Sequence, residues 1–153
     1  MKILLVLLLF TSFESHSSNS REGELLNFKT DYCTYFPEGT PSRPKLWQDC
    51  CVSHDLWYWI GGTKNEQDQA DLVLKRCVSQ KASSFYGNLM YSGVRLGHLS
   101  PIKSKYKWSW GWNKKERHFQ IVSLEEKAQA KQILIGIDEN LYLINKFIKE
   151  HLE

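Results

Sequence analysis

Four residues that are close together in the sequence have side chains suited to chemistry. Two adjacent cysteines, Cys50 and Cys51, are followed one helical turn later by His54 and Asp55. On a helix, Cys50 and His54 share one face while Cys51 and Asp55 share the next. The cysteines can therefore anchor the helix in two directions while an imidazole and a carboxylate project towards one cleft. This pattern predicts a base held beside a site for a hard cation, and the alternative is an exposed polar dipeptide.

Two helices are expected to position these residues. The first begins near Pro44, runs to about residue 60 and ends at the Gly61–Gly62 pair. The second runs over residues 66–82, with Asn65 as its N-cap. The link between them is so short that the two helices should pack antiparallel. Asp71, on the second helix, is then a candidate partner for His54, although it could instead only complement the positive end of the helix dipole.

The N-terminus indicates that the protein is exported, and export favours disulfide formation by the cysteines. Residues 1–18 contain one early lysine, an apolar run over residues 3–10 and a polar end, the pattern of a secretory signal peptide. A retained membrane anchor is less favoured because the run is too short to span a bilayer. The protein is thus expected to be secreted or periplasmic. Its net charge of +3 is too small to indicate a nucleic-acid partner, and we expect a monomer.

Four cysteines in an exported chain predict two disulfides, with three possible pairings. In an antiparallel helix pair bridged by Cys50 and Cys77, positions level with His54 fall near Asp71, since His54 lies roughly 6 Å and Asp71 roughly 9 Å along the helices from those cysteines. Cys33 is then left to bond Cys51. A zinc site is the rival interpretation, but adjacent cysteines lack the usual ligand spacing.

The remaining chain suggests further elements. A short helix is expected over residues 24–29, a proline-rich loop over 31–45 and a third helix over 83–99. Alternating aromatic residues predict a strand over 103–113, paired in a hairpin with 119–122. Its tryptophans are either a core face or a membrane-interface surface; these are Trp108, Trp110 and Trp112. We expect a domain over 19–122, and a final helix over 123–153 that begins at a Ser123–Glu126 capping box and packs on the domain or extends from it. Three histidines are interpreted as surface residues: His98, His118 and His151.

The central motif resembles that of a known family. Cys50-Cys51-x-x-His54-Asp55-x-x-Tyr58, with Asp71 six residues before Cys77, is similar to the active-site helices of secreted phospholipases A2, over residues 32–78. The resemblance implies a divergent, minimal member of that superfamily. It implies a mainly α fold: two long antiparallel disulfide-linked helices, a small β element and a C-terminal helix.

The resemblance also implies an activity and a role for each site residue. The reaction would be calcium-dependent hydrolysis of the sn-2 ester of glycerophospholipids at a membrane interface. His54 would be the general base, Asp71 would orient it, and Tyr58 would hydrogen-bond Asp71. Asp55 would bind Ca²⁺ together with loop carbonyls, for which the candidates are Tyr32, Thr34 and Phe36.

This chain departs from the family pattern at two places. The calcium loop of the family is rich in glycine, whereas here Cys33 is followed by Thr34, Tyr35 and Phe36. Trp57 stands where the family usually has a cysteine. The unusual loop leaves a second hypothesis open, a lipid- or protein-binding module on the same scaffold with weak or lost catalysis. A zinc-binding exported domain is a third.

Overall fold

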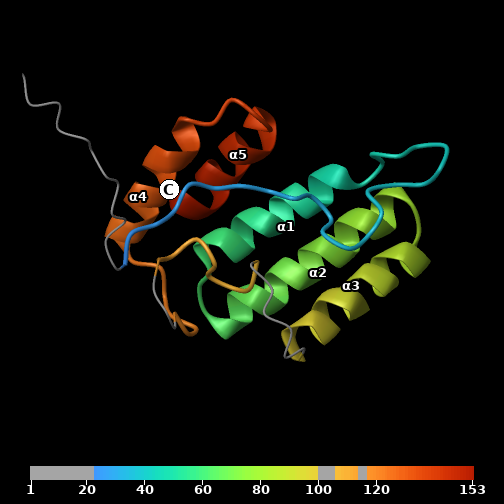
Figure 1. Ribbon diagram of the computed structural model, residues 1–153, viewed down its shortest axis with the longest axis horizontal. Helices are drawn as coiled ribbons and strands as arrows, with labels where there is room; N and C mark the ends of the chain where they lie inside the picture. The colour runs from blue at the N-terminus through green and yellow to red at the C-terminus, as the bar shows by residue number, and fades with distance from the viewer. Residues whose placement is uncertain (1–22, 100–105, 114–116) are drawn as a thin grey trace, which may run out of the picture.

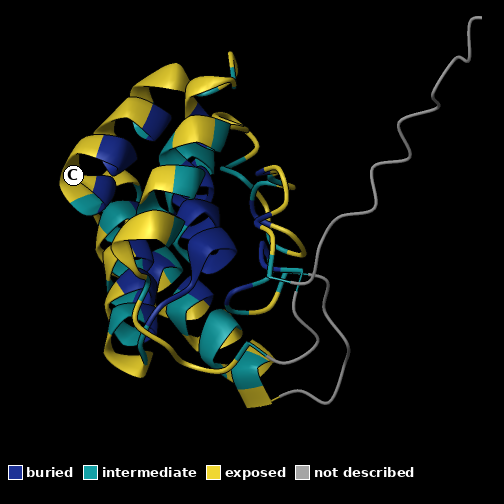
Figure 2. Cartoon of the chain, turned by 90° about the vertical axis from the view of Figure 1, so that its left-hand side faces the viewer, coloured by how far each residue is buried: buried dark blue, intermediate teal, exposed yellow. Residues whose placement is uncertain are grey.

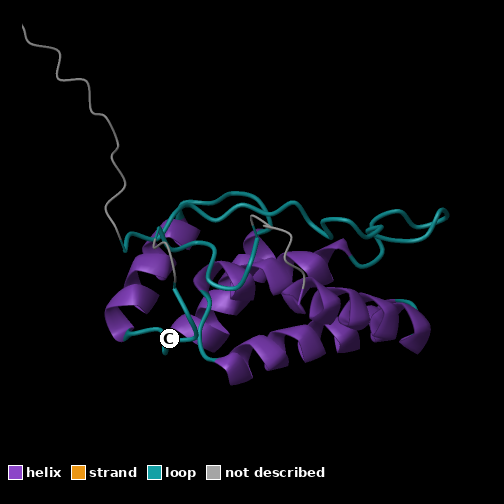
Figure 3. Cartoon of the chain, turned by 60° about the horizontal axis from the view of Figure 1, so that its bottom comes forward, coloured by secondary structure: helices purple, strands orange, loops and turns teal. Residues whose placement is uncertain are grey.

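The computed structural model describes residues 23–99, 106–113 and 117–153, and within them the protein is mainly helical (Figure 3). The helices are α1 (Gln48–Ile60), α2 (Lys64–Lys81), α3 (Ser84–Leu99), α4 (Leu124–Ile135), α5 (Leu141–Phe147) and a terminal π-helical turn, η1 (Ile148–Leu152). No helix in these ranges is long and apolar enough to cross a membrane. The expected signal peptide, residues 1–18, lies outside the described residues.

The helices α1, α2 and α3 lie side by side, and α4 and α5 lie on the other side of α1 (Figure 1). The α1–α2 link is only three residues long, and Gly61 and Gly62 take the positive φ angles that this sharp reversal requires. The N-cap of α2 is Thr63 and not Asn65, because Thr63 forms a reciprocal capping box with Glu66.

Two disulfides tie α1 to its neighbours. Cys50 is bonded to Cys77 of α2, and Cys51 is bonded to Cys33 of the loop before α1. These are the two pairs expected from the sequence. All four thiols are therefore oxidised, so the cysteines cannot serve as thiolate ligands for zinc.

α1 is the centre of the fold because it is buried on two sides (Figure 2). On one side Trp47, Cys50 and Cys51 form a cluster with Leu74 and Val78 of α2 and with α3. On the other side Val52, Leu56 and Trp59 belong to a second cluster, to which the N-terminal segment and the C-terminal helices contribute. A helix packed on both sides holds its polar residues, His54 and Asp55, in a fixed direction.

The aromatic segment is not a strand, so the expected hairpin with residues 119–122 is wrong for the part described, residues 106–113. The segment forms turns that cover the last turn of α1, where the carbonyls of Tyr58, Trp59 and Ile60 lack helical partners. Ser109 N–H donates to the Tyr58 carbonyl at 2.8 Å, and Gly111 N–H donates to the Trp59 carbonyl at 3.0 Å. The Trp112 indole N–H donates to the Ile60 carbonyl at 2.6 Å. The alternating aromatic residues therefore belong to a segment that caps a helix and not to a strand.

The residues expected to form a short helix, 24–29, are extended instead. They run antiparallel to the aromatic segment, with a bridge between Leu25 and Trp112 and a 2.6 Å hydrogen bond from the Leu26 N–H to the Gly111 carbonyl. Leu25 and Phe28 are buried in the core, whereas Leu26 is exposed. Pairing with a distant segment outcompeted local helix formation.

The C-terminal region is a helix hairpin and not one continuous helix. α4 begins at Ser123, whose expected capping box with Glu126 is present, but ends at Gly136. Asn140 then adopts a left-handed conformation that reverses the chain, and α5 and η1 fold back on α4 and pack on α1. Arg117 forms a two-pronged ion pair with Glu126 and lies over the Trp112 ring.

Two glycines provide a stability test of the aromatic segment. A Cβ at Gly111 would lie 2.6 Å from the Trp59 carbonyl oxygen and 2.3 Å from the Trp59 ring, so Gly111→Ala should lower the free energy of unfolding by about 1–3 kcal/mol. The control is Gly93→Ala in α3, where a Cβ meets nothing within 4 Å. Helix propensity should make that variant more stable by about 0.5–1 kcal/mol. Urea unfolding measures both, and equal effects would contradict this packing.

Candidate functional site

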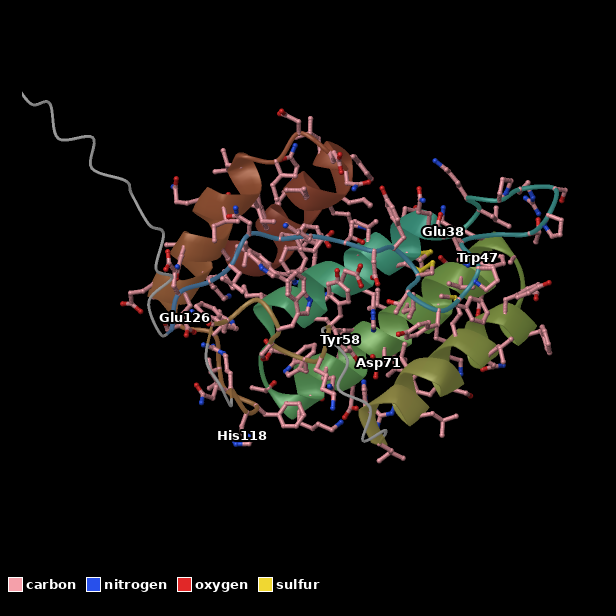
Figure 4. All side chains as sticks on the ribbon, viewed as in Figure 1. Glu38, Trp47, Tyr58, Asp71, His118 and Glu126 are labelled. Carbon is pink, nitrogen blue, oxygen red and sulfur yellow. A yellow bond between two sulfur atoms is a disulfide. The ribbon has the colours of Figure 1, made fainter. Side chains whose placement is uncertain are left out.

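The site is built around the carboxylate of Asp71, which is fully buried between α1 and α2 (Figure 4). His54 Nε2 lies 3.0 Å from Asp71 Oδ1, and the Tyr58 hydroxyl donates to the same oxygen at 2.7 Å. His54 and Tyr58 are one turn apart on α1, so their rings lie together, 4.2 Å between centroids. The structure thus brings together three residues that the sequence analysis selected.

These contacts determine where the proton of His54 lies. An ionised carboxylate can only accept hydrogen bonds, so His54 Nε2 carries the hydrogen that faces Asp71. In the neutral imidazole Nδ1 is then unprotonated. A histidine held in this tautomer by a buried carboxylate is able to take a proton from a group that approaches Nδ1.

Helix α3 adds two residues to this cluster. Arg95 Nη1 lies 3.3 Å from Asp71 Oδ2 and also pairs with Asp68, and His98 Nε2 lies 3.7 Å from Asp71 Oδ2. His98 also forms a hydrogen bond with the Tyr58 hydroxyl. The interpretation of His98 as a partnerless surface residue is therefore wrong, because α3 packs closely against α2.

The two further histidines differ in their surroundings. His118 is exposed, as expected. His151 is only partly exposed and its ring packs at a tilt against Trp57, 4.2 Å between ring centroids, so its interpretation as a surface residue is only partly right.

Burial and charge shift the proton affinities of this cluster in opposite directions. Burial by itself raises the pKa of Asp71, but hydrogen bonds from His54 and Tyr58 outweigh it and hold the pKa below its usual value. Burial raises the pKa of Tyr58, and the charge of Asp71 raises it further. Burial lowers the pKa of His98, although Asp71 opposes this shift. Asp71 is therefore the anion of the cluster, and Tyr58 keeps its proton.

Asp55 points away from this cluster, towards the loop before α1. The Thr30 hydroxyl donates to Asp55 Oδ2 at 2.5 Å, and the Tyr32 N–H donates to Thr30 Oγ1 at 2.9 Å. Burial raises the pKa of Asp55 to about 7, a shift that the Thr30 hydrogen bond opposes and the charge of Asp31 reinforces. A bound cation would offset the cost of burying this carboxylate.

The loop itself has the conformation of a glycine-rich segment without the glycines. Tyr32 and Thr34 have φ angles of 61° and 49°, in the left-handed region that a β-branched threonine rarely adopts. Cys33, between them, is bonded to α1, and the Trp47 indole N–H fixes the loop by donating to the Pro37 carbonyl at 2.6 Å. The covalent bond and the buried tryptophan hold this strained backbone in place.

The oxygen atoms of the Asp55 side chain and of the loop carbonyls are of the kind that a hard cation binds. Within the described residues, no backbone N–H donates to the carbonyls of Tyr32, Thr34 or Phe36. Together with the Asp55 carboxylate they offer only oxygen, which suits calcium. The described part of the chain contains no cluster of three or more His, Cys, Asp or Glu side chains able to bind a metal. A site made mainly of carbonyls does not need such a cluster.

An open groove of about 1370 Å³ connects these parts. His54, Asp55, Tyr58 and His98 lie on its wall, as do loop residues 32–36 and residues of α3. Exposed apolar side chains stand along it, with Tyr35 98% exposed, Leu96 67% and Leu99 82%. Both the imidazole of His54 and the carboxylate of Asp55 can thus meet one ligand.

Sequence analysis missed Thr30, Arg95 and His98. One signal could have found the last two: Asp68 and Asp71 are three residues apart on α2, and Arg95 and His98 are three residues apart on α3. Two acidic side chains and two basic ones at the same spacing predict polar contacts between two packed helices. No comparable pattern marks Thr30.

The raised pKa of Asp55 predicts a pH-dependent effect on stability. In EDTA, as the pH rises from 4 to 7, the unfolded chain releases this proton first, because its pKa is 3.8 when unfolded and about 7 when folded. The stability of the folded state therefore falls over this range. Asp55→Asn should raise the free energy of unfolding by about 1–3 kcal/mol at pH 8 and should have little effect at pH 4.

Urea unfolding in EDTA, followed by tryptophan fluorescence, provides the measurement. The control is Asp138→Asn, at an exposed carboxylate, which should change stability at neither pH. A loss of stability in Asp55→Asn of the same size at both pH values would contradict the expected burial of the charge.

Comparisons of the chain with protein-family models, with curated proteins and with solved structures find no match. What the site does must therefore be inferred from its own residues and their contacts.

Proposed function

We propose that this protein is a calcium-dependent phospholipase A2, a divergent and minimal relative of the secreted enzymes, which hydrolyses the sn-2 ester of glycerophospholipids. The observation that carries the proposal is one groove in which His54 is oriented by Asp71 at 3.0 Å while the neighbouring Asp55 faces an oxygen-rich loop. A base and a cation site on consecutive residues can act on the same ester. The residue pattern and the disulfide pairs support the same assignment.

The chemistry of the dyad follows from its hydrogen bonds. His54 Nδ1 removes a proton from a water molecule, which attacks the ester carbonyl. Asp71 stabilises the imidazolium that forms, as its depressed pKa keeps it anionic. The imidazolium then returns its proton to the leaving alkoxide. Tyr58 holds the carboxylate in place and does not itself transfer a proton, because its own pKa is raised.

Asp55 and the carbonyls of Tyr32, Thr34 and Phe36 are the groups that would hold calcium. Bound there, calcium would supply a positive charge that polarises the ester carbonyl and stabilises the oxyanion. Thr30 orients Asp55 towards the loop through its 2.5 Å hydrogen bond. The left-handed backbone at Tyr32 and Thr34 supports this role, because it lets the loop turn sharply beside Asp55.

The walls of the groove fit an amphiphilic substrate. Exposed apolar side chains of the loop and of α3 suit acyl chains, and Tyr35, Leu96 and Leu99 are the most exposed of these. Lys107, on the same groove, suits an anionic headgroup. A lipid surface would cover these exposed apolar side chains.

The departure from the family at Trp57 has a structural reason. Its ring packs on Phe147 of α5, 5.6 Å between centroids, and on His151 of η1. The C-terminal helix hairpin thus packs against the side of α1 where the usual cysteine of the family would form a further disulfide. This supports a member of the family stabilised by fewer disulfides.

The base can be tested by His54→Gln, which keeps the size of the side chain but removes its basicity. Release of fatty acid from phospholipid vesicles should fall by at least about 100-fold, the usual contribution of a general base. The fold should be retained, as measured by circular dichroism. The matched control is His151→Gln, outside the groove, which should keep its activity. Equal activity in the two variants would sink the proposal.

The metal can be tested separately. Fatty-acid release should stop in EDTA and return when Ca²⁺ is added, since carbonyl and carboxylate oxygens favour this ion. Asp55→Asn should require far more Ca²⁺ for the same rate. Release that persists in EDTA would remove the calcium mechanism, and vesicle binding without release under any condition would favour a lipid-binding module instead.

A further inference from the structure

We infer that His98 is a positioning residue for the base His54, acting through the Tyr58 hydroxyl and the Asp71 carboxylate. The inference rests on the proposed function only for its catalytic consequence. The hydrogen-bond chain itself connects α3 to α1 whatever reaction takes place. Nothing in the motif around His54 indicates a third helix in this role.

The two oxygens of Asp71 have separate partners. Oδ1 accepts from His54 at 3.0 Å and from Tyr58 at 2.7 Å. Oδ2 faces Arg95 at 3.3 Å and His98 at 3.7 Å. With donors on both sides, the buried carboxylate cannot rotate without breaking a contact, so its orientation towards His54 is determined by α3 as well as by α1.

The positions of the hydrogen atoms give a direction to the series of hydrogen bonds that links His98, Tyr58 and Asp71. The Tyr58 hydroxyl has one hydrogen, which it donates to Asp71 Oδ1. The hydrogen bond between Tyr58 and His98 must then be donated by His98 Nε2. His98 therefore occupies the acceptor side of the Tyr58 oxygen and keeps the hydroxyl hydrogen pointing at Asp71. Without His98 the Tyr58 hydroxyl could rotate away from Asp71, and Oδ1 would then accept a hydrogen bond only from His54.

The charges around His98 favour its neutral form. From α1 it faces His54 and Tyr58, from α2 it faces Lys64 and Asp71, and from α3 it faces Arg95. Burial lowers the pKa of His98, the cations lower it further, and Asp71 only partly opposes them. Neutral His98 with its hydrogen on Nε2 is thus the form that supports Tyr58 at neutral pH.

Helix α3 does not need His98 to stay in place. Met90 is buried against the cluster around Trp47, and Val94 packs on the same cluster. Arg95 is bound to Asp68 of α2. The side chain of His98 is 20% exposed at the groove wall, so its removal should leave the helix packed.

The first experiment needs no activity. Long-range ¹H–¹⁵N NMR of the intact, disulfide-bonded protein reports which imidazole nitrogen carries the hydrogen. His54 should keep the Nε2–H form in the wild type and in His98→Ala, but its Nε2–H proton resonance should shift in His98→Ala, because Oδ1 then loses the second hydrogen bond, from Tyr58. His98→Gln, whose amide can donate to Tyr58, should restore the wild-type resonance. An unchanged His54 signal in a folded His98→Ala variant would overturn the inference.

The second experiment is a double-mutant cycle on vesicle hydrolysis. His98→Ala and Tyr58→Phe should each lower kcat by roughly tenfold with little change in KM, and the double variant should lose no more than Tyr58→Phe alone, because the residues act as a unit. His98→Gln should recover most of the rate, and the control His151→Ala should keep it. Additive losses, or no loss in His98→Ala, would overturn the positioning role.

The two experiments separate the two proposals. If the wild type releases no fatty acid while His98→Ala still alters the His54 signal, the proposed function fails and the hydrogen-bond chain stands. If hydrolysis is found but the His54 signal and kcat are unchanged in His98→Ala, the proposed function stands and the role of His98 fails.

Discussion

Burying the carboxylate of Asp71 is the constraint on which the rest of this structure depends. Removing a carboxylate from water costs several kcal/mol unless hydrogen bonds and charges compensate for it. Here the compensation comes from His54 and Tyr58 of α1 and from Arg95 of α3. Three helices must therefore pack at one spacing and register, and the same contacts that satisfy Asp71 orient the imidazole that faces the groove.

α1 gives this arrangement its rigidity. Two adjacent cysteines bond it to α2 and to the loop, and apolar clusters cover it on two sides. The carbonyls at its C-terminal end, which would otherwise be exposed, are satisfied by the aromatic segment. Because the helix is held along its whole length, His54 and Asp55 keep a fixed separation without packing against each other.

The loop before α1 shows how the fold supports an unfavourable conformation. Tyr32 and Thr34 occupy the left-handed region at a cost of about 1–3 kcal/mol each. The disulfide of Cys33 and the anchored ring of Trp47 stabilise the loop from either end. Strain is thus concentrated in the loop whose Thr30 hydroxyl donates to the buried carboxylate of Asp55.

Much of the central hairpin could be predicted from the sequence because its signals are local. Spacing on a helix places His54 beside Asp55, and the short glycine link makes the two helices antiparallel. The spacing of six positions from Asp71 to Cys77 then brings Asp71 level with His54. The capping box at Ser123 is another local pattern that the structure contains.

Other features could not be predicted, because they depend on which distant segments meet. Alternating aromatics at 106–113 look like a strand, yet they cap α1 because that helix end offers unsatisfied carbonyls. Residues 123–153 are expected to form a single helix, but Gly136 and the left-handed Asn140 let the chain fold back and bury Ile144 and Phe147.

The sequence by itself thus determined the helix hairpin, the two disulfide pairs and the pairing of His54 with Asp71, since each follows from spacing along the chain. Only the tertiary structure decided that Thr30 supports Asp55 and that α3 brings Arg95 and His98 to Asp71. The physical reason is that a buried charge takes its partners from whatever lies nearest in space, and spacing along the chain does not specify those neighbours.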